Sequence, residues 1–100
     1  MAAALTIVYW RDIPAQVIAK AGRRSERRVL SARFEKAIDQ AAMHAGLHGS
    51  DAYLEHWRRS SPVACDDDLA AAADEAVARL EATFTPDVLA AHVRAGGREP

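Results

Sequence analysis

The sequence predicts a single α+β domain, in which a small three-stranded antiparallel sheet is covered by about four helices. The sheet would consist of an N-terminal β-hairpin and a short edge strand. Residues 5–10 combine three β-branched with two aromatic residues, apolar residues recur at helical spacing after residue 31, and no linker divides the 100 residues. Strands followed by a run of helices are typical of a sheet with helices on one face.

The first strand is the clearest element. Residues 5–10 contain no glycine or proline, and such a run predicts a strand. Residues 11–14 end it, because Pro14 cannot donate a hydrogen bond to a sheet. Residues 15–20 suit either a second strand or a short helix that begins at Pro14 and ends at Gly22. A strand is preferred, since the run is short and follows another strand.

Four helices are predicted from apolar stripes and capping residues. Apolar side chains three and four positions apart form one face of each, and serine, threonine or aspartate supplies the N-terminal cap. The predicted helices cover residues 31–46, 50–57, 69–84 and 85–95. Residues 63–65 form a short apolar segment, which predicts the edge strand.

The chain is expected to form one domain over residues 1–95 with a flexible tail at residues 96–100. Cys65 is the one cysteine, so an internal disulfide is excluded. No basic residue precedes the apolar N-terminal run, unlike in a signal peptide, and the run is too short to span a membrane. A cytoplasmic location without membrane insertion is therefore expected.

Charge is distributed unevenly along the chain. Residues 1–60 have ten Lys/Arg and six Asp/Glu, a net +4, whereas residues 61–100 have three and eight, a net −5, within an overall charge of −1. A basic end attracts anionic partners. The alternative is that the two halves attract each other in the folded chain.

A candidate binding surface lies in the basic half. It combines the end of the first strand with a basic segment at residues 22–28, which is expected to be an exposed loop or the extended tip of the hairpin. The candidate residues are Trp10, Arg11, Asp12, Arg23, Arg24, Arg27 and Arg28. The other interpretation of the strand end is that the aromatic rings belong to the core and the charged pair faces water.

Arginine makes paired hydrogen bonds to phosphate, so nucleic acid or a phosphate ligand is one interpretation of this surface. An exposed loop without a ligand, or a docking patch for an acidic protein surface, is preferred, because no nucleic-acid-binding motif accompanies the arginines. Aromatic residues are also not interleaved with them, as single-strand binding would favour.

Catalytic and metal-binding interpretations have little support. His44 and His48 are four residues apart, but Gly46 between them predicts a helix end, and structural zinc requires four ligands. Residues 66–68 are three aspartates that fit a helix N-terminus better than a calcium loop. Cys65 has no adjacent base in sequence. We therefore expect no cofactor and no metal.

The sequence also resembles a known family. Residues 5–17, 37–39 with 41–43, 51–54 and 57–59 resemble small bacterial proteins described as virulence factor domains, over most of residues 5–84. The resemblance implies an accessory role beside enzymes of folate- and corrinoid-linked methyl transfer. It assigns no functional residue.

The sequence thus predicts a non-catalytic accessory or protein-interaction module with an unidentified protein partner. The alternative is a nucleic-acid or phosphate-ligand binder that uses the arginines of residues 22–28. Surplus apolar groups on an edge strand would also allow a homodimer.

Overall fold

The computed structural model describes residues 2–100, within which it has five strands and four helices. In chain order the elements are β1 (Ala4–Trp10), β2 (Ile13–Ala21), β3 (Arg24–Val29), α1 (Ala32–His44), α2 (Asp51–Glu55), β4 (Trp57–Arg59), β5 (Val63–Ala64), α3 (Leu69–Thr83) and α4 (Pro86–Arg94). The α+β prediction is confirmed, but the sheet is larger than the three strands predicted. None of the helices described has the length and apolar content needed to cross a membrane.

All pairs in the sheet are antiparallel, in the order β3-β2-β1-β4, and β5 also pairs with β1. The strands β4 and β5 therefore share one edge of β1. Ser60 keeps this edge hydrogen-bonded beyond β4: its N–H donates to the Ile7 carbonyl at 2.9 Å, and its hydroxyl accepts from the Ile7 N–H at 2.9 Å. The Ser60 hydroxyl thus takes the place of a backbone carbonyl acceptor at this edge.

The hairpin of β1 and β2 agrees with the preferred prediction, and residues 15–20 are strand, not helix. The turn is shorter than predicted, because β2 begins at Ile13 and includes Pro14. Proline is tolerated here because the register shifts at this point, with Tyr9 opposite Pro14. Arg11 occupies the turn with a positive φ of 52°.

Two segments were predicted wrongly. The sequence predicts an exposed loop or the extended tip of the hairpin at residues 22–28, but residues 24–29 form the edge strand β3. Charged side chains are common on edge strands, so the segment lacks the apolar alternation that marks a strand. The second predicted helix extends through Trp57, but α2 ends at Glu55, and residues 57–59 form β4 against the end of β1. A helix this short is only marginally stable, and β1 offers open hydrogen-bonding groups.

The other helix ends agree closely with the predictions. Asp68 caps α3 by accepting from the Ala71 N–H at 3.2 Å, and Thr85 caps α4 by accepting from the Val88 N–H at 3.3 Å. Ser31 is the N-cap residue of α1, but its hydroxyl makes no cap bond. It donates instead to Glu81 of α3 at 2.8 Å.

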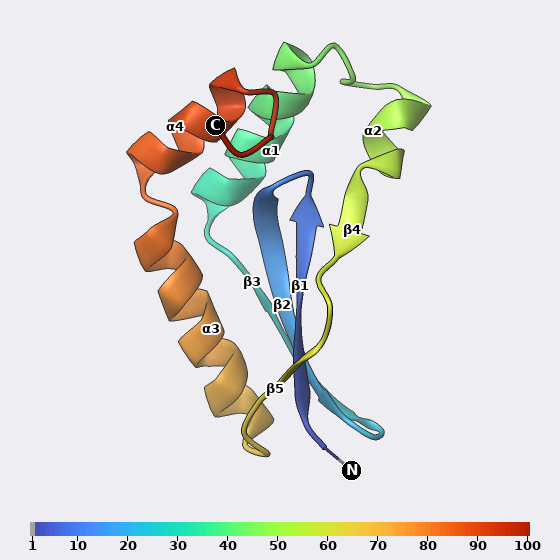
Figure 1. Ribbon diagram of the computed structural model, residues 1–100, viewed down its shortest axis with the longest axis vertical. Coiled ribbons are helices and arrows are strands. Elements are labelled where there is room, and N and C mark those ends of the chain that lie inside the picture. The colour runs from blue at the N-terminus through green and yellow to red at the C-terminus, as the bar shows by residue number, and fades with distance from the viewer. Residues whose placement is uncertain (1) are drawn as a thin grey trace.

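Helix α3 covers one face of the sheet (Figure 1). Small residues dominate this layer, so the helix lies close to the strands. Its buried cluster contains Ala3, Leu5, Val17, Ala19, Ala21, Leu69, Ala73 and Ala76. Each alanine contributes little burial energy compared with about 1.5–3 kcal/mol for a large apolar side chain.

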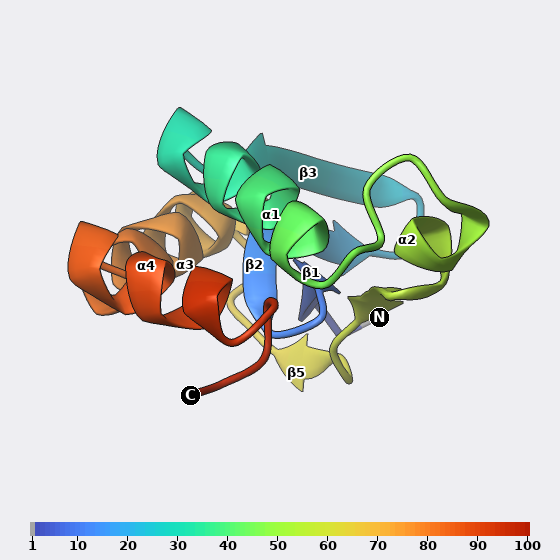
Figure 2. The same ribbon diagram turned by 90° about the horizontal axis from the view of Figure 1, so that it is seen from above.

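The larger apolar side chains gather at the end of the sheet near the β1–β2 turn, where α1 and α4 lie (Figure 2). This cluster includes Trp10, Ile13, Leu30, Phe34, Ile38, Leu89 and Val93. It holds Trp10, Phe34 and Ile13, three of the largest fully buried side chains, each of which contributes more burial energy than an alanine.

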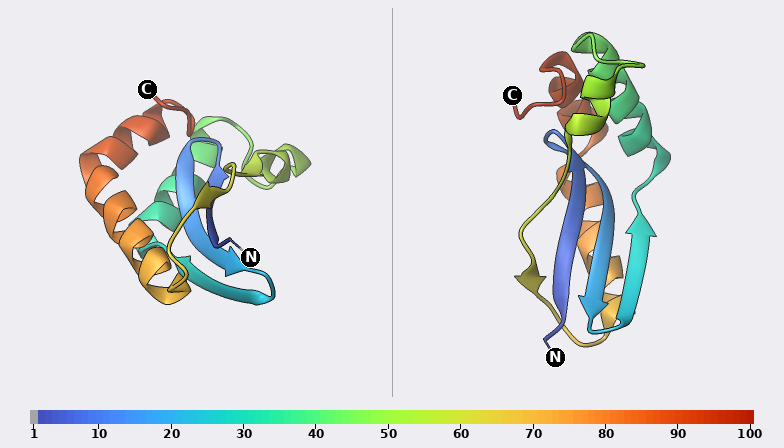
Figure 3. Two further views of the ribbon diagram at one scale, coloured as in Figure 1. Left: turned by 60° about the horizontal axis from the view of Figure 1, so that its bottom comes forward. Right: turned by 90° about the vertical axis from the view of Figure 1, so that its right-hand side faces the viewer.

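The opposite face of the sheet is open in the part of the chain that the structure describes. Seen from that side, the strands lie in front with α3 behind them, and only α2 projects over one end (Figure 3). The registers place Thr6 and Val8 of β1, Gln16, Ile18 and Lys20 of β2, Arg27 and Val29 of β3, and Arg59 of β4 on this surface. We call these residues the open face.

The C-terminal residues lie against the β1–β2 turn. The Asp12 N–H donates to the Gly97 carbonyl at 2.8 Å. Gly97 has a φ of +92°, and a Cβ at this position would lie 2.7 Å from Cζ3 of Trp10. Flexibility of residues 96–100 stays a prediction, but a side chain at Gly97 is excluded by both backbone conformation and space.

Replacing Gly97 by alanine should therefore destabilise the domain more than the same change at Gly49. Gly49 also has a positive φ, of +73°, but nothing lies within 4 Å of a Cβ there. Gly49→Ala should cost about 1 kcal/mol of backbone strain, and Gly97→Ala an additional ~1–3 kcal/mol from overpacking. Urea unfolding measures both, and equal losses would show that residue 97 does not pack on Trp10 in solution.

Candidate functional site

Trp10 belongs to the core. It is 0% exposed, and its indole N–H donates to the Tyr53 carbonyl at 2.8 Å. Of the two interpretations of the strand end, the one in which the aromatic ring belongs to the core therefore fits Trp10. Its side chain contributes to no binding surface. The buried indole has the hydrogen-bond partner that it requires.

Arg11 and Asp12 make internal contacts at the turn. Nη1 of Arg11 donates to the Gly96 carbonyl at 2.8 Å, and the guanidinium lies 5.2 Å from the ring centre of Trp10. Burial, together with nearby Arg98, lowers the pKa of Arg11. Asp12 accepts from the Glu99 N–H at 2.7 Å and from Nη2 of Arg58 at 3.1 Å. The pair thus joins the turn to β4 and the C-terminal residues.

These contacts change the acidity of Asp12. Burial by itself raises the pKa of the carboxyl group, but the Glu99 N–H and the guanidinium of Arg58 lower it by more. The net pKa is below the ordinary value for aspartate, so the charged form is favoured in the folded state. The carboxylate therefore stabilises the fold at neutral pH.

The strand β3 separates the predicted arginines onto two faces, because successive side chains alternate. Arg28 points to α3, where Nε is 2.8 Å from Asp74 and Nη1 is 2.9 Å from Glu26. Hydrogen bonds to Glu26 and Asp74 raise its pKa. Arg24 lies opposite Ala21 on the same side as Arg28, whereas Arg27 lies opposite Ile18 on the open face. Arg23 is in the turn before β3. The four arginines therefore do not form one patch.

The open face combines basic and apolar side chains. Val8 lies between Gln16 and Arg59 across the strands, and Ile18 lies between Thr6 and Arg27. Long polar side chains cover these two apolar residues, which are almost fully buried.

At the edge of the open face, Val29 is 75% exposed. Lys20, Arg27 and Arg59 are exposed. Within residues 2–100 the side chains of these three make no hydrogen bond or ion pair with the rest of the chain.

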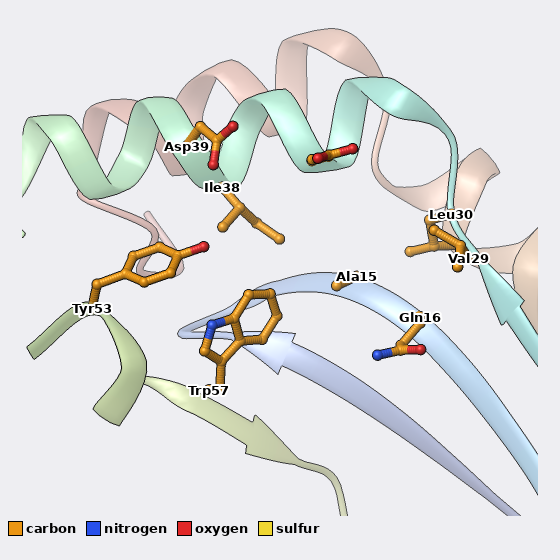
Figure 4. A pocket seen from close by; sticks show the side chains of 9 residues that line it. Ala15, Gln16, Val29, Leu30, Ile38, Asp39, Tyr53 and Trp57 are labelled. Atoms are coloured by element: carbon orange, nitrogen blue, oxygen red, sulfur yellow. The ribbon is translucent and has the colours of Figure 1, made fainter. Parts of the chain in front are cut away.

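A groove of about 330 Å³ lies at one end of the open face, between α1, α2 and the ends of β2 and β3. Figure 4 shows Tyr53 and Trp57 on one side of the groove and Asp39, which projects from α1, on the other. Ala15, Leu30 and Ile38 supply apolar lining, and Glu35 is the second carboxylate. We call Glu35, Asp39, Tyr53 and Trp57 the aromatic groove.

Two aromatic walls of the groove meet at a right angle. The rings of Tyr53 and Trp57 are 6.1 Å apart with an interplanar angle of 89°. Tyr53 also stacks on Trp10 at 5.5 Å, which fixes its orientation. Burial, and then the carboxylates of Asp39 and Glu35, raise the pKa of Tyr53, so its hydroxyl keeps its proton. Sequence analysis missed the groove, because its residues come from three elements.

A second depression, of about 630 Å³, lies between β1 and the α3–α4 junction. Its polar lining includes Asp12, Arg58 and Glu99, which already bind one another. His92 is 6% exposed, and its Nδ1 is 2.8 Å from the Val88 carbonyl. These groups therefore join the C-terminal segment to the sheet.

The predicted helix-capping role of the aspartates is confirmed at Asp68. Asp66 accepts from the Asp68 N–H at 2.8 Å, which orders the turn before α3. Cys65 is half-buried against the alanine-rich cluster. No group of three potential metal-ligating side chains occurs among the residues described.

The fold defines a class of α+β domain whose antiparallel sheet has one helix-covered face and one open face. Residues 8–93 match the family model described as Virulence factor. The chain belongs to this family, and the resemblance seen in the sequence is confirmed. No curated protein and no solved structure matches the chain.

The contacts of Asp12 predict a specific pH dependence of stability. Because the folded-state pKa is lowered, the stabilisation is fully present above the ordinary aspartate pKa of about 3.9. It is lost as the pH falls through the lower pKa of the folded state. Asp12→Asn should therefore reduce the free energy of unfolding at pH 7 and flatten its decrease in acid.

Urea unfolding between about pH 2 and pH 7 covers the range over which aspartate titrates. Asp67→Asn is the matched control, because Asp67 is exposed and its side chain accepts no hydrogen bond among those described at this turn. If the free energy of unfolding of Asp12→Asn decreased in acid as steeply as that of the wild type, the contacts assigned to Asp12 would be contradicted.

Proposed function

We propose that this domain is a non-catalytic interaction module that presents the open face of its sheet to an acidic protein surface. The observation that carries the proposal is the composition of this face. Lys20, Arg27 and Arg59 lie on the same face as the largely exposed Val29, and no helix of the described chain covers them. A sheet usually buries its apolar face against another layer.

Charge and shape both favour a protein partner. Apolar groups within a polar, charged border are typical of protein interfaces. The basic side chains would increase the rate of encounter with an acidic surface and exclude basic ones. Val29 would supply apolar contact area to a partner, because its side chain is largely exposed. It lies on β3 two residues from Arg27, which pairs with the buried Ile18 of β2.

Nucleic acid is the weaker candidate. Arg28 and Arg58, which could have bound phosphate, are bonded to Asp74 and Asp12. Lys20, Arg27 and Arg59 lie on the open face with one aromatic residue, Trp57, at the end of β4. Single-stranded nucleic acid normally requires several aromatic platforms on which bases stack.

We include in this proposal an accessory role beside enzymes of folate- and corrinoid-linked methyl transfer. Its support is the resemblance to the virulence factor family, not a residue of the open face. Such enzymes are the first partners to test directly, with purified proteins.

Reversing charge on the open face should weaken partner binding. Partners would be isolated from an extract of the source organism and identified, and the dissociation constant of each purified pair would then be measured. Arg27→Glu with Arg59→Glu should weaken binding by about tenfold or more. Arg79→Glu with Arg94→Glu is the matched control, because it changes net charge equally at exposed positions on α3 and α4.

Equal affinities of the two double variants would contradict the proposed surface. A single-stranded oligonucleotide, titrated at about 50 mM and about 200 mM salt, tests the alternative. Steeply salt-dependent binding that Arg27→Glu with Arg59→Glu abolishes would overturn the proposal in favour of nucleic acid.

A further inference from the structure

The aromatic groove has a composition unlike the rest of the surface. Its lining combines Tyr53, Trp57 and the apolar side chains of Leu30 and Ile38 with the carboxylates of α1. At about 330 Å³, its volume is at the small end of the usual ligand sites, which are about 300–1,000 Å³. It therefore suits a small group with an apolar body.

The aromatic rings are held in place before any ligand binds. Tyr53 stacks on the buried Trp10, whose indole N–H also binds the Tyr53 carbonyl. Trp57 is fixed by pairing of β4 with β1, opposite Trp10. The ring of Trp57 and the hydroxyl end of Tyr53 line the same space, with the two ring planes at 89°. An aromatic ring attracts a cation that lies within about 6 Å of its centre.

The carboxylates add negative charge to the same space. Glu35 and Asp39 are four residues apart on α1, so they lie on one face of the helix. Like charges at this spacing destabilise a helix. In the part of the chain that the structure describes, neither forms an ion pair. A cation in the groove would relieve this repulsion.

We propose that the aromatic groove binds an alkylammonium cation, with Tyr53 and Trp57 contacting its methyl or methylene groups and Glu35 and Asp39 neutralising its charge. The proposal concerns a separate ligand and does not rest on the binding function of the open face. Two sources share this chemistry: a free small alkylammonium compound and a lysine side chain, methylated or not, of another protein.

Other ligands fit the groove less well. An anion would be repelled by Glu35 and Asp39. A metal ion would find two carboxylates, and no set of three metal-ligating groups occurs among the residues described. A neutral apolar group would fill the space but would gain no attraction from the two exposed carboxylates. The charge and the rings together therefore select an organic cation.

The direct test compares choline with its neutral carbon isostere, 3,3-dimethyl-1-butanol, at constant ionic strength. Both are titrated into the full chain while NMR follows the Trp57 indole N–H and the backbone amides of Asp39 and Tyr53. Choline should give saturable shifts, with a dissociation constant on the order of millimolar for so small a ligand. The isostere should bind at least about tenfold more weakly.

Variants separate the contributions of charge and rings. Glu35→Gln with Asp39→Asn should weaken choline binding by about tenfold. Asp67→Asn with Glu75→Gln changes net charge equally at exposed positions outside the groove and should leave binding unchanged. Trp57→Leu should weaken binding similarly. Because Trp57 lies in a sheet strand, circular dichroism must first show that this variant folds, and the carboxamide pair remains decisive if it does not.

A capped tetrapeptide containing lysine, and the same peptide with trimethyl-lysine, distinguish the sources. Binding at least about tenfold tighter than that of choline would assign the groove to a protein side chain, and tighter binding of choline would assign it to a free compound. Equal binding of choline and its isostere, or no saturable shift with choline or either peptide, would overturn the proposal.

The open-face variant Arg27→Glu with Arg59→Glu should retain choline binding. The experiments therefore distinguish a failure of the ligand proposal for the aromatic groove from a failure of the partner proposal for the open face.

Discussion

Burial of Trp10 is the constraint on which the rest of the structure depends. Its ring lies in the cluster that α1 and α4 form at the end of the sheet, and its N–H holds the backbone of α2 through Tyr53. Gly97 packs directly on it, and Arg11 lies over it. Segments from both ends of the chain thus meet at one side chain. In a core otherwise rich in alanine, this residue contributes more buried apolar area than any neighbour.

The position of Trp10 also explains why an aromatic surface exists beside a buried core. The residue that fixes α2 brings Tyr53 over the end of the sheet, and β4 then pairs with β1 so that Trp57 lies opposite Trp10. Stability and the proposed ligand site therefore share Tyr53. One side of its ring is covered by the core, and the hydroxyl end lines the groove (Figure 4). Stacking on Trp10 and the bond from its indole N–H thus position Tyr53 more precisely than the short helix α2 could by itself.

The sequence was sufficient for the parts of the fold whose order is local. The first strand, the hairpin and the long helices carry strong patterns of side-chain type, spacing and capping. It was insufficient for β3 and β4, whose arginines do not alternate with apolar residues and whose strand state comes from pairing with β2 and β1. The sequence identifies the candidate arginines as a basic group, but only the strand geometry shows that Arg27 and Arg28 lie on opposite faces of the sheet. The aromatic groove depends on contacts between distant segments, which no local pattern contains.

The two faces of the sheet are under different physical constraints. On the face covered by α3, alanine is required because the helix lies close to the strands, and a larger side chain would separate the layers. On the open face no such limit applies, yet Val29 remains largely exposed at its edge, where an exposed apolar side chain carries a risk of aggregation. Basic side chains on the same strands reduce that risk, because like charges oppose the face-to-face approach of two copies. The same charges would favour the acidic partner that we propose for this face, so one set of residues would both oppose self-association and select the partner.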